Sequence, residues 1–330
     1  MTDDILVVGC GSIGERHLRC FQHTGRARVA ACDANAALLD RVAGQYGIEG
    51  FTNLDAALEA HRYAGIVICT PAHTHLDIAL PALKHGTGLL IEKPLSTGLD
   101  KVPAVQAVIA RAGKFVGVAY VYHFMPWILG ARKVLMSGEL GAPLHVSVAT
   151  GQHFPTFRPA YREIYYARHE SGGGAIQDAL THIANAVEWL VGPTTRLFCD
   201  AAHQLLEGVS VEDTVSVAAR NGGVLVNYAL NQFQAPNEMT MQIHCEGGSV
   251  KIEGHEQRFG VFRRATNAWE WHQPAPLERD EIFITQANAF LDGLHGKPTG
   301  LCTFDEAVRT LKFNLAALES ARSGKAVEIA

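Results

Sequence analysis

Residues 5–14 read Ile5-Leu6-Val7-Val8-Gly9-Cys10-Gly11-Ser12-Ile13-Gly14 and indicate how the N-terminal half folds. The apolar run predicts a buried strand, and a helical pattern of apolar residues begins within the glycine-rich turn. A second apolar run, residues 27–32, leads into Asp33, nineteen positions after Gly14. This order of strand, glycine-rich turn, helix, strand and acid predicts a dinucleotide-binding unit.

Each residue type in the turn has a physical role. Gly9 permits the tight turn, Gly11 lets the backbone approach a pyrophosphate, and Gly14 lets the helix pack closely on the strand. Ser12 and Ile13 begin the helix, whose free N–H groups and dipole bind a pyrophosphate without a cationic side chain. The alternative is a glycine-rich turn in an α/β fold that binds no nucleotide.

The acid at the end of the second strand indicates which dinucleotide binds. Asp33 is expected to accept hydrogen bonds from the adenosine ribose, and its charge would repel a 2′-phosphate. The next residues, Ala34 and Asn35, supply no cation that could hold such a phosphate. We therefore expect NAD rather than NADP.

Composition limits the class of protein. The chain has 330 residues, enough for two domains, and a net charge of −5 without a block of like charges. This charge argues against nucleic acid and anionic membranes and favours a small-molecule partner. No apolar stretch reaches membrane-spanning length, and the first strand follows the N-terminus too closely for a signal peptide. Seven scattered cysteines predict reduced thiols in the cytoplasm.

Two further strands of the first half end in residues that can reach a ligand. Residues 65–70 end in Thr70-Pro71, and residues 88–91 lead into Glu92-Lys93-Pro94. The carboxyl ends of strands form the ligand side of an open α/β sheet. A doubly wound parallel sheet is completed by expected helices and one more strand, at 35–46, 53–60, 98–112 and 115–119.

Lys93 and His75 are candidates for this edge. Lys93 could lower the pKa of a substrate hydroxyl beside the nicotinamide, although its position equally suits an exposed lysine in a turn. His73 and His75 resemble a metal pair, but they do not share a helix face and no carboxylate or cysteine completes the set. We expect no metal, and His75 near the cofactor.

After residue 121 the pattern changes. A helix at 126–137 and a strand at 143–153 precede an aromatic and basic segment, residues 154–168. This segment predicts either a surface loop or a substrate wall, because arginine and tyrosine suit carboxylates and polyols. The residues that would form the wall are Arg158, Tyr161, Arg162 and Tyr165.

Gly172-Gly173-Gly174 leads into an expected helix that runs to about residue 191. Asp178 and His182 are four residues apart on it, so the carboxylate can hold one imidazole nitrogen and leave the other as a proton acceptor. Such a pair also occurs often by chance, and the sequence alone does not make it catalytic.

The rest of the chain predicts an open, antiparallel sheet followed by helices at 280–295 and 304–323, the last with a Thr303–Glu306 capping box. Strands are expected at 196–203, 213–220, 223–231, 239–245, 248–253 and 258–263. Alternating apolar residues such as Val224, Val226 and Tyr228 suggest that a partner subunit covers the free face. We expect a homodimer or homotetramer.

Four motifs in order resemble the Gfo/Idh/MocA oxidoreductase family: Gly9-x-Gly11-x-x-Gly14, Thr70-Pro71, Glu92-Lys93-Pro94 and the glycine-led Asp178/His182 helix. The resemblance implies an N-terminal Rossmann domain, residues 1–121, and an α+β domain, residues 122–330, with a large, predominantly antiparallel sheet. It implies transfer of a hydride between NAD and a hydroxyl or keto carbon of a sugar, sugar acid or cyclitol.

By position, the resemblance assigns catalysis to Lys93, Asp178 and His182. It places around the cofactor Gly9, Gly11, Ser12, Ile13, Gly14, Asp33, Thr70, Pro71, His75, Glu92 and Lys93. The resemblance also places His123 and Asn185 beside the substrate, with His123 among the residues that would contact it. Both depart from the family's frequent arginine and aspartate, so the substrate charge of better-known members is not transferred. Alternatives are a non-catalytic NAD-binding sensor and an NAD-dependent glycosidase of the same fold.

Overall fold

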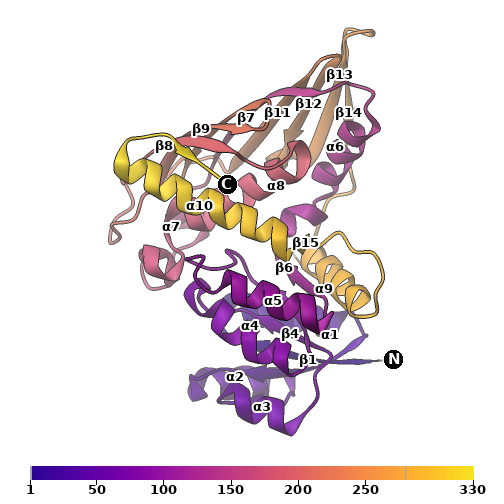
Figure 1. Cartoon of the computed structure of the whole chain (residues 1–330), viewed down its shortest axis with the longest axis vertical. Helices are drawn as coiled ribbons and strands as arrows, with labels where there is room; N and C mark the ends of the chain where they lie inside the picture. Colours follow the sequence, from indigo (N-terminus) through magenta and orange to yellow (C-terminus); the bar gives the residue numbers. More distant parts are fainter. Residues whose placement is uncertain (1, 279) are drawn as a thin grey trace. The chain divides into compact units, whose positions relative to one another are not determined.

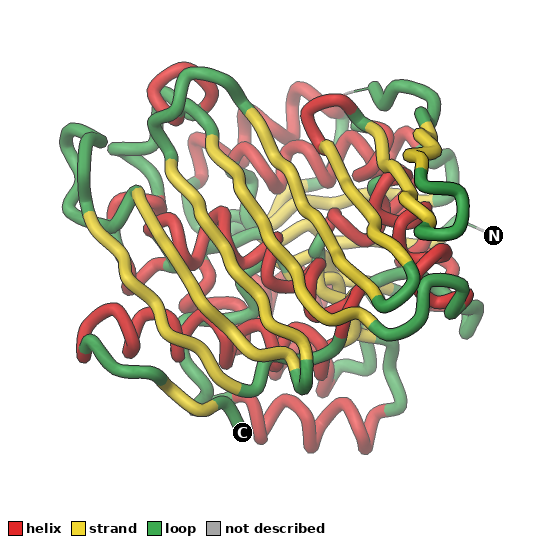
Figure 2. The backbone as a smooth tube through the Cα atoms, turned by 90° about the horizontal axis from the view of Figure 1, so that it is seen from above, coloured by secondary structure: helices red, strands yellow, loops and turns green. Residues whose placement is uncertain are grey.

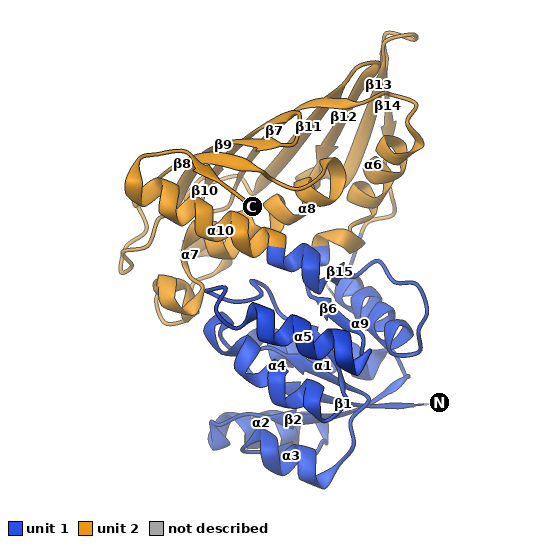
Figure 3. Ribbon diagram, viewed as in Figure 1, with its two compact units in different colours: residues 1–121, 277–308 blue, residues 122–276, 309–330 orange. Residues whose placement is uncertain are grey.

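The chain divides into two compact units in the computed structural model, which describes residues 2–278 and 280–330. Unit 1 comprises Met1–Val121 and Leu277–Val308, and unit 2 comprises Tyr122–Pro276 and Arg309–Ala330 (Figure 3). The sequence predicts a single boundary after residue 121, which places residues 277–308 with the second half. In the structure this segment packs within unit 1, where Phe290 meets Phe21 edge to face at 5.9 Å.

Unit 1 contains a doubly wound sheet, as the sequence predicts, in the order β15-β6-β5-β4-β1-β2-β3 (Figure 1). The strands pair in parallel except β15, which is antiparallel to β6. Their bounds are β1 Asp3–Val8, β2 Ala27–Cys32, β3 Gly50–Phe51, β4 Gly65–Ile68, β5 Gly88–Ile91, β6 Val116–Val118 and β15 Cys302–Thr303. The strand order reverses between β1 and β4, the point where open α/β sheets bind ligands.

Helices connect these strands. They are α1 Ser12–His23, α2 Ala36–Tyr46, α3 Leu54–Ala60, α4 His75–Lys84, α5 Val102–Ala112 and α9 Glu281–Leu294. The sequence predicts a helix from about residue 98, whereas α5 begins at Val102. Proline lacks an N–H and is tolerated in the first helical turn, so Pro103 fixes this start.

Unit 2 contains the larger sheet, in the order β14-β13-β12-β11-β7-β10-β9-β8-β16. It is predominantly antiparallel, as predicted, with the pair β7 and β10 parallel. Its strands are β7 Pro143–Gly151, β8 Arg196–Ala202, β9 Thr214–Asn221, β10 Val224–Asn231, β11 Glu238–Cys245, β12 Gly248–Glu253, β13 Arg258–Arg263, β14 Ala268–His272 and β16 Val327–Glu328. Strand β14 is not predicted from the sequence, because its exposed residues lack the alternation of a half-buried strand.

Helices α6 Pro126–Ser137, α8 Thr181–Val191 and the unit 2 part of α10 Phe304–Ser323 lie on one face of this sheet (Figure 3). The short helix α7, Phe154–Phe157, follows β7, and a π-helical turn at Ile176–Leu180 leads directly into α8. The predicted capping box of α10 is confirmed, because the Glu306 N–H donates to the Thr303 hydroxyl at 3.2 Å. In the part of the chain described, no helix is long and apolar enough to cross a membrane.

The apolar residues that suggested a subunit interface lie on the face that the protein's own helices cover. Val226 is 1% exposed, and the Tyr228 ring packs edge-on against Phe313 of α10 at 5.7 Å. The other face carries the alternate residues of β10, such as Asn227 and Ala229, which are exposed. Figure 2 looks onto this bare face. Alternation in the sequence therefore predicted the strand correctly. Its apolar side, however, packs against the protein's own helices and is not the free face.

A buried carboxylate anchors the loop before β9. Asp213 is 0% exposed and accepts hydrogen bonds from the N–H groups of residues 204, 205 and 206 and from the Thr214 hydroxyl, at 2.8–2.9 Å. Burial raises the pKa of Asp213, but the hydrogen bonds from these donors together lower it by more, so the pKa lies below its ordinary value. The charged form is therefore the one that the fold stabilises.

We expect Asp213→Asn to lower the free energy of unfolding at neutral pH by about 1–3 kcal/mol, because the amide cannot accept all of these hydrogen bonds. Because the folded pKa is depressed, the contribution of the carboxylate is complete above the unfolded pKa and is lost as the pH falls through the folded pKa. Urea unfolding of both proteins from neutral to acidic pH measures this. An equal difference at every pH would contradict the assignment.

Candidate active site

The glycine-rich turn has the geometry that a pyrophosphate requires. Gly9 has a φ of +96°, and a Cβ there would lie 2.8 Å from the backbone of Cys69, so only glycine fits. A Cβ on Gly14 would lie 1.7 Å from the Gly9 carbonyl oxygen, which shows how closely α1 approaches the turn. A Cβ on Gly11 would meet nothing within 4 Å. Space therefore remains beside Gly11 at the N-terminus of α1, where Ser12 is exposed and Ile13 half-buried.

Asp33 is fixed beside this turn. Its carboxylate accepts hydrogen bonds from the N–H of Cys10 at 2.7 Å and the N–H of Asn35 at 2.8 Å. The side chain is half-buried, so part of it stays accessible to a ligand. Together, the open space at Gly11, the free end of α1 and this acid fit an adenine dinucleotide.

The Glu92-Lys93-Pro94 loop follows β5 and is held by its own acid. Glu92 is 6% exposed and accepts hydrogen bonds from His17 Nε2 at 2.7 Å and from the Lys93 N–H at 3.0 Å. Burial raises the pKa of Glu92, but His17 and Lys93 together lower it by more, so the pKa lies below its ordinary value. The Glu92 carboxylate thus bonds to the chain itself, whereas Lys93 is half-buried and precedes a cis peptide bond to Pro94.

His75 binds two loops at the edge of the same sheet. Its Nε2 lies 2.7 Å from the carbonyl oxygen of Thr70, and its Nδ1 lies 3.1 Å from that of Pro94. Burial lowers the pKa of His75, although both carbonyl groups oppose the shift. Thr70 is half-buried, whereas Pro71 and His73 are exposed. No group of three or more potential metal ligands occurs among the described residues.

The second group of candidates lies in unit 2, on the helix after Gly174. Asp178 lies in the π-helical turn, is 7% exposed, and accepts a hydrogen bond from the Tyr165 hydroxyl at 2.6 Å. The sequence predicts an ordinary α-helical start here. π-Helical turns replace the i+4 spacing with i+5 and occur frequently at functional sites.

His182 lies at the start of α8, next to an aromatic ring. It is half-buried and stacks on Tyr122, with ring centroids 5.1 Å apart. Burial raises the pKa of Tyr122, and the charge of Arg158 opposes that shift. His123 is 1% exposed and stacks on Trp189 at 4.0 Å. His123 therefore packs in the interior of unit 2.

The aromatic and basic segment divides into buried and exposed residues. Tyr161 is 1% exposed in a cluster with Phe154 and Tyr166, and its hydroxyl donates to the Glu207 carbonyl at 2.7 Å. Arg162 is exposed and donates to the same carbonyl. Arg158 and Tyr165 are exposed. Tyr161 thus packs the segment, and the other predicted wall residues remain accessible within unit 2.

Two supporting residues were missed by the sequence analysis. Glu212 accepts a hydrogen bond from the Ile176 N–H at 2.8 Å, and its other oxygen bonds to His169, whose pKa this contact raises. Glu212 thereby holds the start of the helix that carries Asp178. The second such residue is His17, whose hydrogen bond holds the Glu92 carboxylate. A histidine on a buried helix face was visible in the sequence, but its partner 75 residues away was not.

We expect Gly11→Ala and Gly14→Ala to separate ligand binding from folding. The Gly11 variant should keep the wild-type melting temperature but bind NADH at least about tenfold more weakly, because its methyl group occupies space needed by a pyrophosphate. The Gly14 variant should melt at a lower temperature, because its Cβ overlaps the Gly9 carbonyl. Thermal melts and fluorescence titration measure both effects. Unchanged NADH affinity in the Gly11 variant would contradict this site.

Comparison with known proteins agrees with this geometry. Residues 4–120 match the Gfo/Idh/MocA oxidoreductase family with an NAD-binding Rossmann fold, and residues 128–251 match the C-terminal domain of that family. Inositol 2-dehydrogenase of Rhizobium meliloti strain 1021 is 28% identical over 78% of this chain and 77% of its own length.

Solved structures show the same fold. Levoglucosan dehydrogenase in complex with NADH aligns with a TM-score of 0.90 at 18% identity, over 100% of both chains. The WlbA dehydrogenase from Bordetella pertussis, in complex with NADH and UDP-GlcNAcA, aligns with a TM-score of 0.85 at 22% identity, over 100% of this chain and 99% of its own. The chain therefore belongs to the Gfo/Idh/MocA oxidoreductase family, and its N-terminal domain is that family's NAD-binding Rossmann fold.

Proposed function

We propose that this protein is an NAD-dependent dehydrogenase or reductase that acts on a CH–OH carbon of a small polyol, sugar or sugar acid. The observation that carries this proposal is the glycine-rich turn of unit 1, whose geometry fits a dinucleotide. Unit 2 adds the buried, hydrogen-bonded Asp178 on its glycine-led helix. The names of the relatives, an inositol dehydrogenase and a levoglucosan dehydrogenase, support the substrate class. Seven buried, free cysteines support a reducing, cytoplasmic location.

The preference for NAD over NADP rests on Asp33. Its carboxylate is fixed by the N–H groups of Cys10 and Asn35 and cannot swing away from a 2′-phosphate without losing both hydrogen bonds. A fixed negative charge disfavours a phosphate dianion at the same position. The fluorescence titration described above, repeated with NADPH, tests this preference, and equal affinity would remove the argument.

In the proposed reaction His182 accepts the substrate's hydroxyl proton. Bound NAD would accept a hydride from the carbon that carries this hydroxyl. Imidazole suits the proton transfer because its ordinary pKa lies near neutrality. Lys93 stabilises the negative charge that develops on the substrate oxygen. Asp178 stabilises the protonated imidazole, and Tyr165 fixes the carboxylate through its hydroxyl at 2.6 Å.

We expect His182→Ala and Lys93→Met each to lower kcat by about 10²–10⁴-fold, because each removes a group that acts on the substrate oxygen. Asp178→Asn should lower kcat less, since the imidazole remains. NADH affinity should stay near wild type in all three variants, because the pyrophosphate and ribose contacts lie elsewhere. Steady-state kinetics and NADH titration measure these effects. Near-full kcat in His182→Ala would show that another residue carries the proton.

The substrate is found by screening polyols, aldoses and uronic acids for NADH production. NADH accumulation with a free sugar supports the dehydrogenase and contradicts a glycosidase that returns its cofactor oxidised. NADH binding without turnover of any compound would favour the sensor function.

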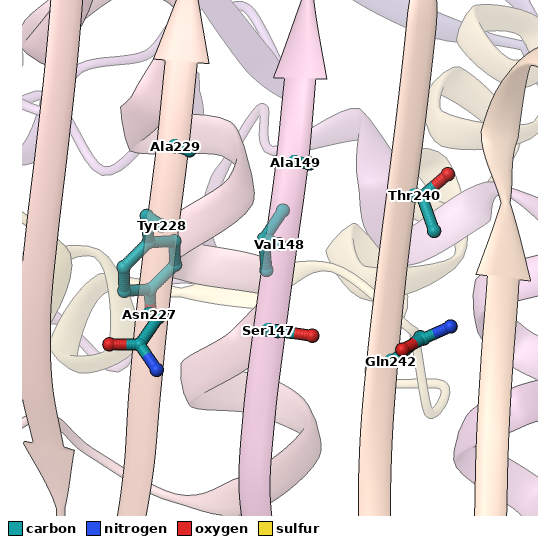
Figure 4. Close-up of a pocket in the computed structure, with 8 residues that line it drawn as sticks. All are labelled: Ser147, Val148, Ala149, Asn227, Tyr228, Ala229, Thr240 and Gln242. Carbon is teal, nitrogen blue, oxygen red and sulfur yellow. The ribbon is translucent and has the colours of Figure 1, made fainter.

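We also propose that the bare face of the larger sheet binds a second copy of the chain. Its centre is small and uncharged: Asn227 and Gln242 flank Ser147 in register, and Ala229 pairs with Ala149. These residues line a depression of about 360 Å³ (Figure 4). Phe198 and Leu225 on the same face are 43% and 47% exposed. Small central side chains let two sheets pack face to face, and exposed apolar residues favour their association.

We expect Ala229→Glu to shift the protein from oligomer to monomer, because symmetry would bring like charges into a desolvated interface at a cost of several kcal/mol. Ala110→Glu on α5 adds the same charge to another exposed surface and should leave the assembly unchanged. Light scattering at micromolar concentration gives the mass of each. A wild-type monomer, or an unchanged Ala229→Glu oligomer, would contradict this interface.

A further inference from the structure

The buried pair of His17 and Glu92 joins two functional elements of unit 1. His17 lies on α1 and is 0% exposed, and its Nε2 is 2.7 Å from Glu92 Oε1. The other carboxylate oxygen, Oε2, accepts the N–H of Lys93 at 3.0 Å. The Glu92 carboxylate therefore connects α1 to the backbone of Lys93, although His17 and Glu92 are 75 residues apart in the sequence.

The chemistry of the pair fixes which atom donates. An ionised carboxylate only accepts hydrogen bonds, so His17 Nε2 carries the proton. His17 Nδ1 has no hydrogen-bond partner within the described residues, and the ring packs edge-on against Phe283 at 5.8 Å. In the contact between Nε2 and the carboxylate, His17 donates and Glu92 accepts.

The position of His17 on α1 gives the pair its meaning. Gly14 and His17 lie within one turn of the helix, and a rigid helix moves as a unit over so short a distance. The N-terminus of α1 is the end that faces a pyrophosphate. Any shift of α1 that accompanies dinucleotide binding therefore reaches Glu92 through His17, and reaches the Lys93 backbone through Glu92.

We propose that His17 is a positioning residue that aligns Lys93 with the bound dinucleotide, by linking α1 to the Lys93 N–H through Glu92. The proposal rests on the proposed function of Lys93. His75 supports the same loop from the other side through the Pro94 carbonyl. The loop is thus contacted on both sides of Lys93, at the Lys93 N–H by Glu92 and at the Pro94 carbonyl by His75, and the Glu92 contact leads to the cofactor helix.

A pair that only stabilises the fold would behave differently. Loss of such a pair lowers the melting temperature without changing how the Lys93 loop responds to cofactor. Arg19 provides a matched control, because it lies two residues further along α1, on another face, and is paired with Asp280 at 2.6 Å. Arg19→Gln removes an ion pair from the same helix and leaves His17 and Glu92 intact.

Hydrogen exchange with NADH as the probe tests the link without any substrate. In wild type and in Arg19→Gln, NADH should slow exchange both in residues 10–17 and at the Lys93 amide. In His17→Leu it should still slow exchange in residues 10–17 but lose at least about half of the effect at Lys93. His17→Gln should restore that effect, because its amide can replace the Nε2–H donor. His17→Asn, which is too short to reach Glu92, replaces the leucine variant if that does not fold.

Kinetics and pH dependence give a second readout. With a verified substrate, His17→Leu should lower kcat about 10- to 100-fold with little change in NADH affinity, since small misplacements of a catalytic group cost this much. Loss of His17 also leaves the burial of Glu92 less compensated, so its pKa rises and the acid limb of kcat/KM moves to higher pH. Besides His17, Glu92 interacts electrostatically with Lys93, His75 and the Cys69 thiol.

The results separate the two proposals. If His17→Leu keeps the wild-type exchange response at Lys93, or if wild type shows no such response, the link is wrong. If Lys93→Met lowers kcat while His17→Leu changes only the melting temperature, the proposed function stands and the positioning role fails. If Lys93→Met leaves kcat unchanged, the catalytic role of Lys93 fails, and the exchange response alone decides whether the link exists.

Discussion

The contact between α1 and the glycine-rich turn is the constraint on which the arrangement of unit 1 depends. A Cβ on Gly14 would lie 1.7 Å from the Gly9 carbonyl oxygen, so the helix can approach this closely only with glycine at position 14. This approach places the N-terminus of α1 at the strand ends and brings His17, one turn later, within 2.7 Å of Glu92. The same close packing thus shapes the pyrophosphate site and anchors the Lys93 loop.

In unit 2, two neighbouring acids, Glu212 and Asp213, fix the backbone by accepting hydrogen bonds from its N–H groups. Asp213 binds the N–H groups of residues 204–206 and fixes the loop before β9. Glu212 binds the N–H of Ile176, and its own carbonyl accepts the N–H of Ala175. A carboxylate at a helix N-terminus satisfies free N–H groups and matches the helix dipole. The helix that carries Asp178 therefore begins at a position fixed by the adjoining sheet.

The sequence predicted what depends on local residues. The glycine turn, the acid after the second strand and the strands of both sheets follow from spacing and periodicity, which neighbours in the chain determine. The partners of His17 and Glu212 are 75 and 36 residues away, and no local pattern announces them. Alternation in β10 predicted the strand correctly but could not tell which face the helices cover. Buried Tyr161 shows the same limit, because composition alone does not separate a substrate wall from packing.

Two of the candidate catalytic groups, Lys93 and Asp178, depend on a buried carboxylate that accepts hydrogen bonds from the chain. The Lys93 backbone is held through Glu92, and Asp178 is held by Tyr165 at 2.6 Å. In each case a buried carboxylate takes donors from the chain, so its hydrogen bonds exist before any substrate arrives. Groups held in this way need little reorganisation when charge develops, and such preorganisation is often the largest contribution to catalysis. Aromatic contacts, such as the stacking of His123 on Trp189 at 4.0 Å, add to the rigid setting of these hydrogen bonds.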